Sequence, residues 1–137
     1  MDMKIELINV PVTDVDRAKA FYVDTLGFNP DFDQVVQPGL RFVQLTPPGS
    51  ACSIVIGEGT TEMKPGTQLG LLMVVADVEA LRTELVGRGL AATEVKDEGW
   101  GLFSYFSDPD GNTWSLQQLP VEATETPVQE QDSSVTA

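Results

Sequence analysis

The sequence contains no histidine, and this absence excludes more kinds of metal site and active site than any other feature of its composition. Histidine is the commonest metal ligand in proteins and the commonest general acid or base near neutral pH. A metal site in this chain would therefore need carboxylates, amides or the single cysteine, Cys52. Acid–base catalysis would need a carboxylate, lysine or tyrosine whose pKa is shifted by its surroundings.

Cysteine is scarce, and long apolar runs are absent from the sequence. With one cysteine the chain can form no internal disulfide, which suits a cytoplasmic location. Cys52 precedes the apolar run 53–56, so we expect a buried and inert thiol rather than a nucleophile. We expect no signal peptide and no association with a membrane, because no stretch approaches the ~20 apolar residues of a membrane span.

Basic residues are scarce. Eight of them stand against 21 acidic residues, and the net charge is −13. Part of this excess lies at the C-terminal end, in Glu122, Glu125, Glu130 and Asp132, but the rest of the chain is still clearly acidic. Such a field repels phosphate backbones, so nucleic acid is not an expected partner.

The first half of the chain has the pattern of a βαβββ unit. Residues 5–12 predict a strand, and Asp14 fits the N-cap of a helix that ends before Gly27. Three more strands are predicted at residues 28–36, 40–45 and 52–56, separated by Pro- and Gly-containing turns.

The same order returns in the second half. Residues 69–75 predict a strand, and Asp77 fits the N-cap of a helix that ends near Gly87. Three strands are predicted at residues 90–95, 102–106 and 113–119, the last two joined by a hairpin turn. The predicted organisation is a first module at residues 1–57, a linker at 58–67, a second module at 68–119 and a disordered acidic tail at 120–137.

The two halves also align in sequence. Residues 12–16 match residues 75–79 at a shift of 63, and residues 39–40 match residues 101–102 at a shift of 62. The repeat favours duplication of one module over two unrelated units that share only caps and turns. We predict an α+β fold in which two βαβββ modules are related by a pseudo-twofold axis. Their curved mixed sheets would enclose a cup-shaped pocket.

Two motifs carry a resemblance to a known superfamily. VPVTDVDRAKAFY at residues 10–22 is followed by LGF at 26–28, and FSDPDGN stands at residues 106–112. With the repeat, they resemble the vicinal oxygen chelate superfamily, which includes glyoxalase I, extradiol dioxygenases and bleomycin-resistance proteins. The resemblance covers residues 4–119 and implies the fold. It leaves the function open, because this scaffold serves isomerases, dioxygenases, epimerases, thiol transferases and drug-binding proteins.

The resemblance also places the metal ligands of metal-dependent members. Histidines lie seven residues before each helix-capping aspartate, and a glutamate lies three residues after the asparagine of the last hairpin. These positions hold Leu7, Gly70 and Ser115 here, and the repeat puts a fourth position near Ser53. Since none offers carboxylate, imidazole or thiolate, we expect no metal cofactor and neither glyoxalase I nor extradiol dioxygenase activity.

Alternate residues of a strand face the same side, so the strand neighbours of these positions are predicted to line the same pocket. The repeat pairs Phe42 with Ser104 and Gln44 with Phe106, and Trp100 stands at the start of the seventh predicted strand. The predicted ligand-binding residues are Leu7, Asn9, Phe42, Gln44, Ser53, Gly70, Leu72, Trp100, Ser104, Phe106, Ser115 and Gln117. Such a wall suits a flat, partly apolar organic molecule. In the alternative, these residues pack against each other and leave no cavity.

Three classes of function stay open. The favoured one is a homodimeric, metal-independent binding protein that sequesters an aromatic or partly apolar natural product or antibiotic, as bleomycin-resistance proteins do. The second is a metal-free lyase or isomerase. Its candidate acid–base residues form no pair recognisable by spacing, and they are Glu6, Asp33, Glu94, Glu98 and Tyr105. The third is a metalloenzyme with ligands at other positions. No catalytic residue is assigned.

Overall fold

The structure is a computed structural model, and it describes residues 1–121 of the 137-residue chain. The predicted acidic tail lies outside the described residues except for Pro120 and Val121. Among residues 1–121, no helix is long and apolar enough to cross a membrane.

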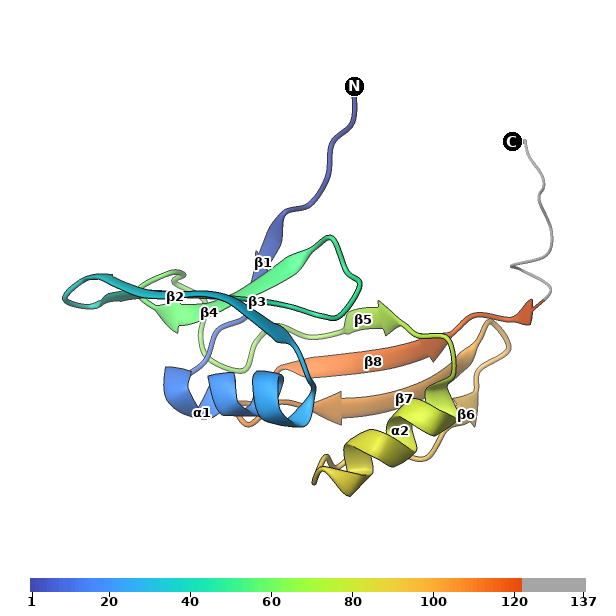
Figure 1. Ribbon diagram of the computed structural model, residues 1–137. Coiled ribbons are helices and arrows are strands. Elements are labelled where there is room, and N and C mark those ends of the chain that lie inside the picture. Colours follow the sequence, from blue (N-terminus) through green and yellow to red (C-terminus); the bar gives the residue numbers. More distant parts are fainter. Residues whose placement is uncertain (122–137) are drawn as a thin grey trace.

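Each half of the chain forms a four-stranded mixed sheet with one helical segment. The first module contains β1 (Leu7–Asn9), α1 (Val15–Ala20), the π-helical turn η1 (Phe21–Thr25), β2 (Asn29–Gln37), β3 (Leu40–Thr46) and β4 (Ser53–Glu58). The second contains β5 (Leu71–Val74), α2 (Val78–Gly87), β6 (Lys96–Asp97), β7 (Leu102–Ser107) and β8 (Thr113–Gln118). The strand orders are β1-β4-β3-β2 and β5-β8-β7-β6, which confirms the predicted βαβββ repeat (Figure 1).

Both helices begin where the sequence places their caps. The Asp14 carboxylate accepts a hydrogen bond from the Arg17 N–H, and the Asp77 carboxylate accepts one from the Ala80 N–H, each at 3.0 Å. Both aspartates have extended backbones, as N-cap residues do. After α1 the helix continues as η1, and Gly27, with φ of 83°, ends it in the left-handed conformation predicted for that glycine.

One predicted strand is largely missing. The second strand expected in the second module, at residues 90–95, is absent from the structure, and the described residues show only the short strand β6 (Lys96–Asp97) after it. Side chains take up the hydrogen-bonding groups of this segment. Arg82 and Ser104 both donate to the Thr93 carbonyl at 2.7 Å, and the Thr93 hydroxyl accepts from the Tyr105 N–H at 2.9 Å. The backbone therefore runs beside β7 without a regular ladder.

A single hydrophobic core joins the two modules. α1 packs on β4, and α2 packs on β7 and β8, so each sheet has one helix-covered side (Figure 1). Tyr22 of η1 contacts Trp114 of β8 edge to face, with ring centroids 5.8 Å apart. Trp114 in turn stacks on Phe106 at 6.2 Å. Because residues of both modules fill one core, the modules form one folded unit.

The two sequence motifs bind each other across this junction. The Asp108 carboxylate accepts hydrogen bonds from the Tyr22 hydroxyl at 2.7 Å and from the Asn112 side-chain amide at 2.8 Å. The same amide donates to the Pro11 carbonyl at 2.8 Å. The Thr13 hydroxyl donates to the Asp110 carboxylate at 2.7 Å. These motif residues hold the modules together.

Candidate ligand-binding faces

Each sheet has a second side, which neither of the helices within residues 1–121 covers. In the first sheet Leu7 pairs with Ser53 and Gln44 pairs with Val55, so these side chains project to the same side. Their neighbours Ile54 and Ile56 belong to the hydrophobic core cluster instead, whereas Val55, although buried, does not. We call this side the first open face. It is made of Leu7, Asn9, Phe32, Phe42, Gln44, Thr46, Ser53 and Val55.

The first open face combines an aromatic pair with a small polar network. Phe32 and Phe42 meet edge to face, with centroids 5.6 Å apart. The Gln44 amide donates to the Ser53 hydroxyl at 3.0 Å, and the Ser53 and Thr46 hydroxyls lie 2.7 Å apart. The Thr46 hydroxyl also donates to the Asp31 carboxylate. The face thus presents aromatic surface beside hydroxyl and amide groups, with one carboxylate bonded to this network.

The second open face is the equivalent side of the second sheet. Leu72 pairs with Ser115 on β8, and Ser115 pairs with Tyr105 on β7. Val74 and Phe103 both pair with Gln117. These pairs define the face, which is made of Leu72, Val74, Phe103, Tyr105, Thr113, Ser115 and Gln117.

This face carries a stacked aromatic pair and a carboxylate. The rings of Phe103 and Tyr105 are 5.9 Å apart and within 9° of parallel. The Tyr105 hydroxyl donates to the Glu98 carboxylate at 2.7 Å, and this hydrogen bond raises the pKa of Tyr105. The phenol therefore stays protonated at neutral pH, with its oxygen able to accept a further hydrogen bond.

The structure brings most of the predicted pocket residues onto these faces. Leu7, Asn9, Phe42, Gln44 and Ser53 lie on the first open face. Leu72, Ser115 and Gln117 lie on the second.

Trp100 lies between β6 and β7, and this residue is 68% exposed. Its carbonyl accepts a hydrogen bond from the Gln117 amide at 3.2 Å, which places it beside the second open face.

Ser104 and Phe106 lie on the other side of their sheet, so their predicted positions are wrong. Phe106 stacks on Trp114 in the core, and the fully buried Ser104 bonds to Thr93. The cause is register. Gln44 of β3 and Phe103 of β7 are equivalent, because Gln44 pairs with Val55 of β4 and Phe103 pairs with Gln117 of β8. Residue numbers therefore shift by 59 from β3 to β7, and not by the predicted 62. An odd error exchanges the two faces of a strand.

Gly70 also differs from its prediction. It precedes β5 rather than lying inside a strand, and its φ of 80° is one that L side chains rarely adopt. Its N–H donates to the Thr113 hydroxyl at 2.7 Å. Strand pairing makes Leu72, and not Gly70, the equivalent of Leu7. Leu7 pairs with Ser53, and Leu72 pairs with Ser115, the counterpart of Ser53 in the second module.

The four positions equivalent to metal ligands do not fit a divalent ion. Corrected for register, they are Leu7, Ser53, Leu72 and Ser115, which supply two neutral hydroxyls. Within residues 1–121, no three histidine, cysteine, aspartate or glutamate side chains are placed to hold a metal.

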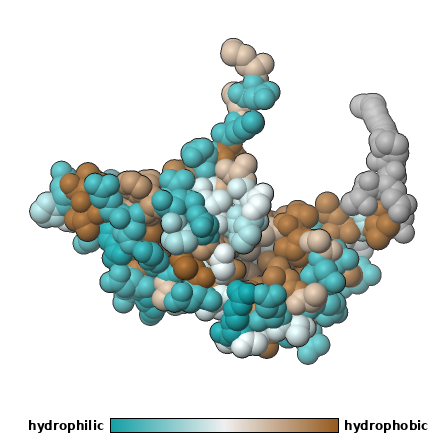
Figure 2. All heavy atoms as spheres, viewed as in Figure 1, coloured by the Kyte–Doolittle hydropathy of each residue, from teal (hydrophilic) through white to brown (hydrophobic). Residues whose placement is uncertain are grey.

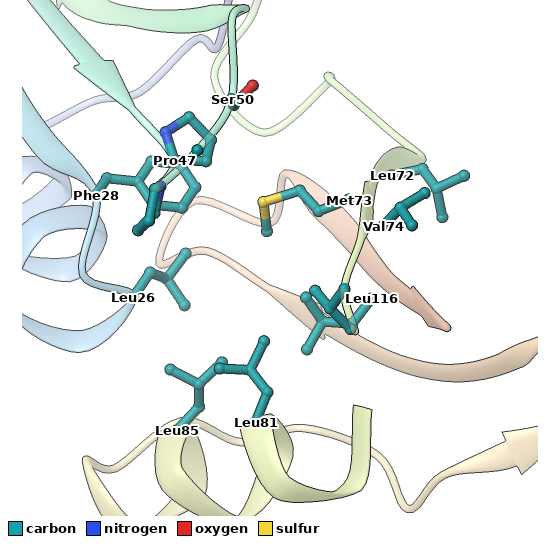
Figure 3. Close-up of a pocket in the computed structure, with 13 residues that line it drawn as sticks. Leu26, Phe28, Pro47, Ser50, Leu72, Met73, Val74, Leu81, Leu85 and Leu116 are labelled. Atoms are coloured by element: carbon teal, nitrogen blue, oxygen red, sulfur yellow. The ribbon is translucent and has the colours of Figure 1, made fainter. Parts of the chain in front are cut away.

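A cavity of about 430 Å³ lies at the junction of the modules (Figure 3). Leu26 and Phe28 line it from the first module, and Leu81, Leu85 and Leu116 from the second. Met73 projects from β5 into it, while Leu72 and Val74 line it from the same strand (Figure 3). Leu72 is the one predicted pocket residue among those that line this cavity; the other walls come from segments of both modules, and their meeting depends on how the modules pack.

Comparisons with known proteins agree with this geometry. TnmS3, an antibiotic binding protein from Streptomyces sp. CB03234, is 39% identical, covers 87% of this chain and 98% of its own, and superposes with a TM-score of 0.79. A glyoxalase/bleomycin resistance protein from Streptomyces sp. CB03234 is 40% identical, with coverage of 84% and 100% and a TM-score of 0.74. The uncharacterized protein YetH of Bacillus subtilis is 26% identical over 126 residues, which are 86% of this chain and 100% of YetH. Residues 4–116 match the profile of the Glyoxalase/Bleomycin resistance protein/Dioxygenase superfamily, and the chain belongs to this superfamily.

Proposed function

We propose that this protein binds a planar, partly apolar organic molecule, such as an aromatic natural product or antibiotic, on its open faces and without a metal. The observation that carries the proposal is the composition of the two faces. Each combines an aromatic pair with serine and glutamine side chains, namely Phe32 and Phe42 in one and Phe103 and Tyr105 in the other. Aromatic rings bind a flat ligand by stacking, and a few neutral polar groups orient it.

Two further observations support the proposal. The donors at the metal-ligand positions do not fit a divalent ion. The similar protein TnmS3 is described as an antibiotic binding protein, and the likeness extends over nearly all of both chains. We propose that sequestration takes place in the cytoplasm, where a lone reduced cysteine is ordinary.

A homodimer is part of the proposal. One open face covers only one side of a flat ligand, and water would still reach the other side. If two copies associate so that the first open face of one meets the second open face of the other, the ligand is enclosed. Enclosure increases the apolar area that binding removes from water.

One contact favours a second candidate, a metal-free lyase or isomerase. Glu98 and Tyr105 were separate candidates in the sequence, and the structure joins them by a hydrogen bond beside Ser115. A carboxylate and a phenol in contact can together accept and return a proton. In this case Tyr105→Phe would abolish turnover and leave ligand affinity nearly unchanged.

A thermal-shift screen against aromatic natural products, followed by recovery of each stabilising compound, tests the proposal. A binding protein gives a melting temperature that rises with ligand concentration and returns the compound unchanged. Recovery of an altered compound would establish the enzyme instead. If no aromatic compound stabilises the protein, the proposed ligand class is wrong.

The matched variants Phe32→Ala and Val35→Ala test the placement. Both residues are exposed on β2, but Val35 pairs with Arg41 on the opposite side from the first open face. Phe32→Ala should weaken binding about tenfold, the loss of one aromatic contact. Val35→Ala should leave the dissociation constant unchanged. Equal effects of the two changes would refute the open face as the binding surface.

A further inference from the structure

Hydrogen bonds on the first open face form one continuous chain. The Gln44 amide bonds to the Ser53 hydroxyl at 3.0 Å, and the Ser53 and Thr46 hydroxyls lie 2.7 Å apart. The Thr46 hydroxyl bonds to the Asp31 carboxylate, whose other oxygen accepts from the Asn29 amide at 2.7 Å. No ion pair of residues 1–121 includes Asp31. The chain therefore ends at a carboxylate that neutral donors hold in place.

The carboxylate fixes the direction of every hydrogen bond in this chain. An ionised carboxylate only accepts, so the Thr46 hydroxyl donates its one proton to Asp31. Thr46 must then accept from Ser53, which donates its own proton to that bond. Ser53 must in turn accept an N–H of Gln44. Both hydroxyls have thus donated their protons, and each keeps one lone pair.

The carboxylate and the two hydroxyls make up what we call the acceptor end of the first open face, namely Asp31, Thr46 and Ser53. Ser53 is 4% exposed, whereas Thr46 is half-buried and Asp31 is exposed, so Thr46 and Asp31 are the members that a ligand can reach. The amides of Gln44 and Asn9 carry further N–H groups, so other parts of the face can donate. The acceptor end itself offers a ligand lone pairs, because both of its hydroxyl protons are already donated.

We propose that the ligand carries a hydroxyl or N–H group that donates a hydrogen bond to the Thr46 oxygen at the acceptor end. The inference rests on the proposed function and narrows its ligand class to flat aromatic molecules with a hydrogen-bond donor at one edge. An ether, carbonyl or ring-nitrogen acceptor in this place would face lone pairs instead of a proton. Such a group would lose its hydration without gaining a hydrogen bond.

The position of Thr46 suits the polar edge of such a ligand. Phe32 pairs with Gln44, so its ring stands about 7 Å along β3 from Thr46, within reach of a ligand of two fused rings. Figure 2 shows residues of intermediate hydropathy over the β3–β4 loop, which follows Thr46, and hydrophobic residues gathered over β5. A ligand stacked on Phe32 would therefore bring its edge, rather than its apolar body, to Thr46.

The second open face differs in the hydroxyl equivalent to Ser53. Tyr105 donates its proton to Glu98, as Thr46 does to Asp31. The Ser115 hydroxyl, however, makes no hydrogen bond within residues 1–121 and can still donate. The donor of the ligand is therefore expected at the first open face and not at the equivalent point of the second.

Two bicyclic probes test the inference with the full chain. Indole carries an N–H donor at its edge, and quinoline carries a ring nitrogen that only accepts. Titration followed by nuclear magnetic resonance gives a dissociation constant for each. The wild type should bind indole about tenfold more tightly than quinoline, which is the effect of one hydrogen bond. Equal affinity, or a preference for quinoline, would overturn the inference.

Asp31→Ala should improve the binding of the wrong probe. Without the carboxylate, the Thr46 proton is free to bond to an acceptor, so quinoline should bind about fivefold more tightly than to the wild type. Indole should keep its affinity, since the Thr46 oxygen can still accept. Asp24→Ala, the matched control, removes an exposed carboxylate of η1 and should leave both affinities unchanged. Unchanged quinoline binding in Asp31→Ala, or weaker indole binding, would contradict the assignment to Thr46.

Thr46→Val gives the complementary readout. It removes the accepting oxygen, so indole should lose its advantage over quinoline, whereas Thr46→Ser keeps the hydroxyl and should keep the preference. The outcomes also separate this inference from the proposed function. Equal binding of both probes to the wild type would refute the donor alone and leave the binding surface in place. If neither probe binds, the open faces do not take flat aromatic molecules, and both proposals are wrong.

Discussion

At the residue scale, the hydroxyl of Tyr22 links the two modules. It donates to Asp108 and accepts from the Trp114 indole N–H at 3.0 Å, and the tyrosine is fully buried. Burial, followed by the Asp108 charge, raises the pKa of Tyr22 far above its usual value of 10.0. The neutral phenol is thus part of the folded state, and both of its hydrogen bonds cross between the modules.

Tyr22→Phe should lower the free energy of unfolding by about 1–3 kcal/mol, because it leaves the Trp114 N–H and an Asp108 oxygen without this partner. Urea unfolding measures the loss. Tyr105→Phe also removes a tyrosine–carboxylate bond, but on an open face, and should cost less. If the two variants are equally stable, the buried network does not stabilise the junction.

A second residue-scale prediction concerns acid stability. Hydrogen bonds from Arg41 and Lys19 lower the pKa of Asp33 from 3.8 to about 2. A carboxyl whose pKa is lower in the folded state stabilises the fold above 3.8, and this contribution disappears as the pH falls towards about 2. Asp33→Asn should therefore show a shallower loss of stability over this range in urea titrations. Asp24→Asn, at an exposed position of η1, should follow the wild type. Parallel curves for Asp33→Asn and wild type would contradict the assignment.

At the scale of elements, caps and turns could be predicted from sequence because their cause is local. Asp14, Asp77 and Gly27 act through hydrogen bonds or backbone angles within a few residues. The strand predicted at residues 90–95 is wrong because the side chains of Arg82 and Ser104, which lie in other elements, donate hydrogen bonds to the Thr93 carbonyl. The prediction of which β7 side chains lie on the open face is wrong because strand register depends on the partner strands. An error of three residues in the alignment of the repeat exchanged the two sides of β7.

The Asp77 cap gives a prediction at this scale. Asp77→Ala should cost about 1 kcal/mol in unfolding free energy, since the Ala80 N–H loses its acceptor. Asp77→Asn keeps a side-chain oxygen and should retain most of the stability. Chemical denaturation of the two variants compares them directly. A loss in the asparagine variant as large as in the alanine variant would show that the charge, rather than the capping bond, stabilises α2.

At the scale of the whole molecule, the module order and the repeat were visible in the sequence, whereas the junction was not. Eight of the twelve predicted pocket residues lie on the open faces, because alternation along β1, β3, β4, β5 and β8 follows from short-range pattern. The pairing of Glu98 with Tyr105 and the cavity beside Met73 depend on how loops and modules pack. Packing of this kind has no signature in a single sequence.

The most direct test of the account is the affinity of a ligand from the thermal-shift screen, measured by calorimetry before and after dialysis against a metal chelator. Metal-independent binding on the open faces predicts the same dissociation constant in both samples, with the ligand chemically unchanged afterwards. Loss of binding after chelation would contradict the account, because it would mean that residues other than Leu7, Ser53, Leu72 and Ser115 hold a metal required for binding.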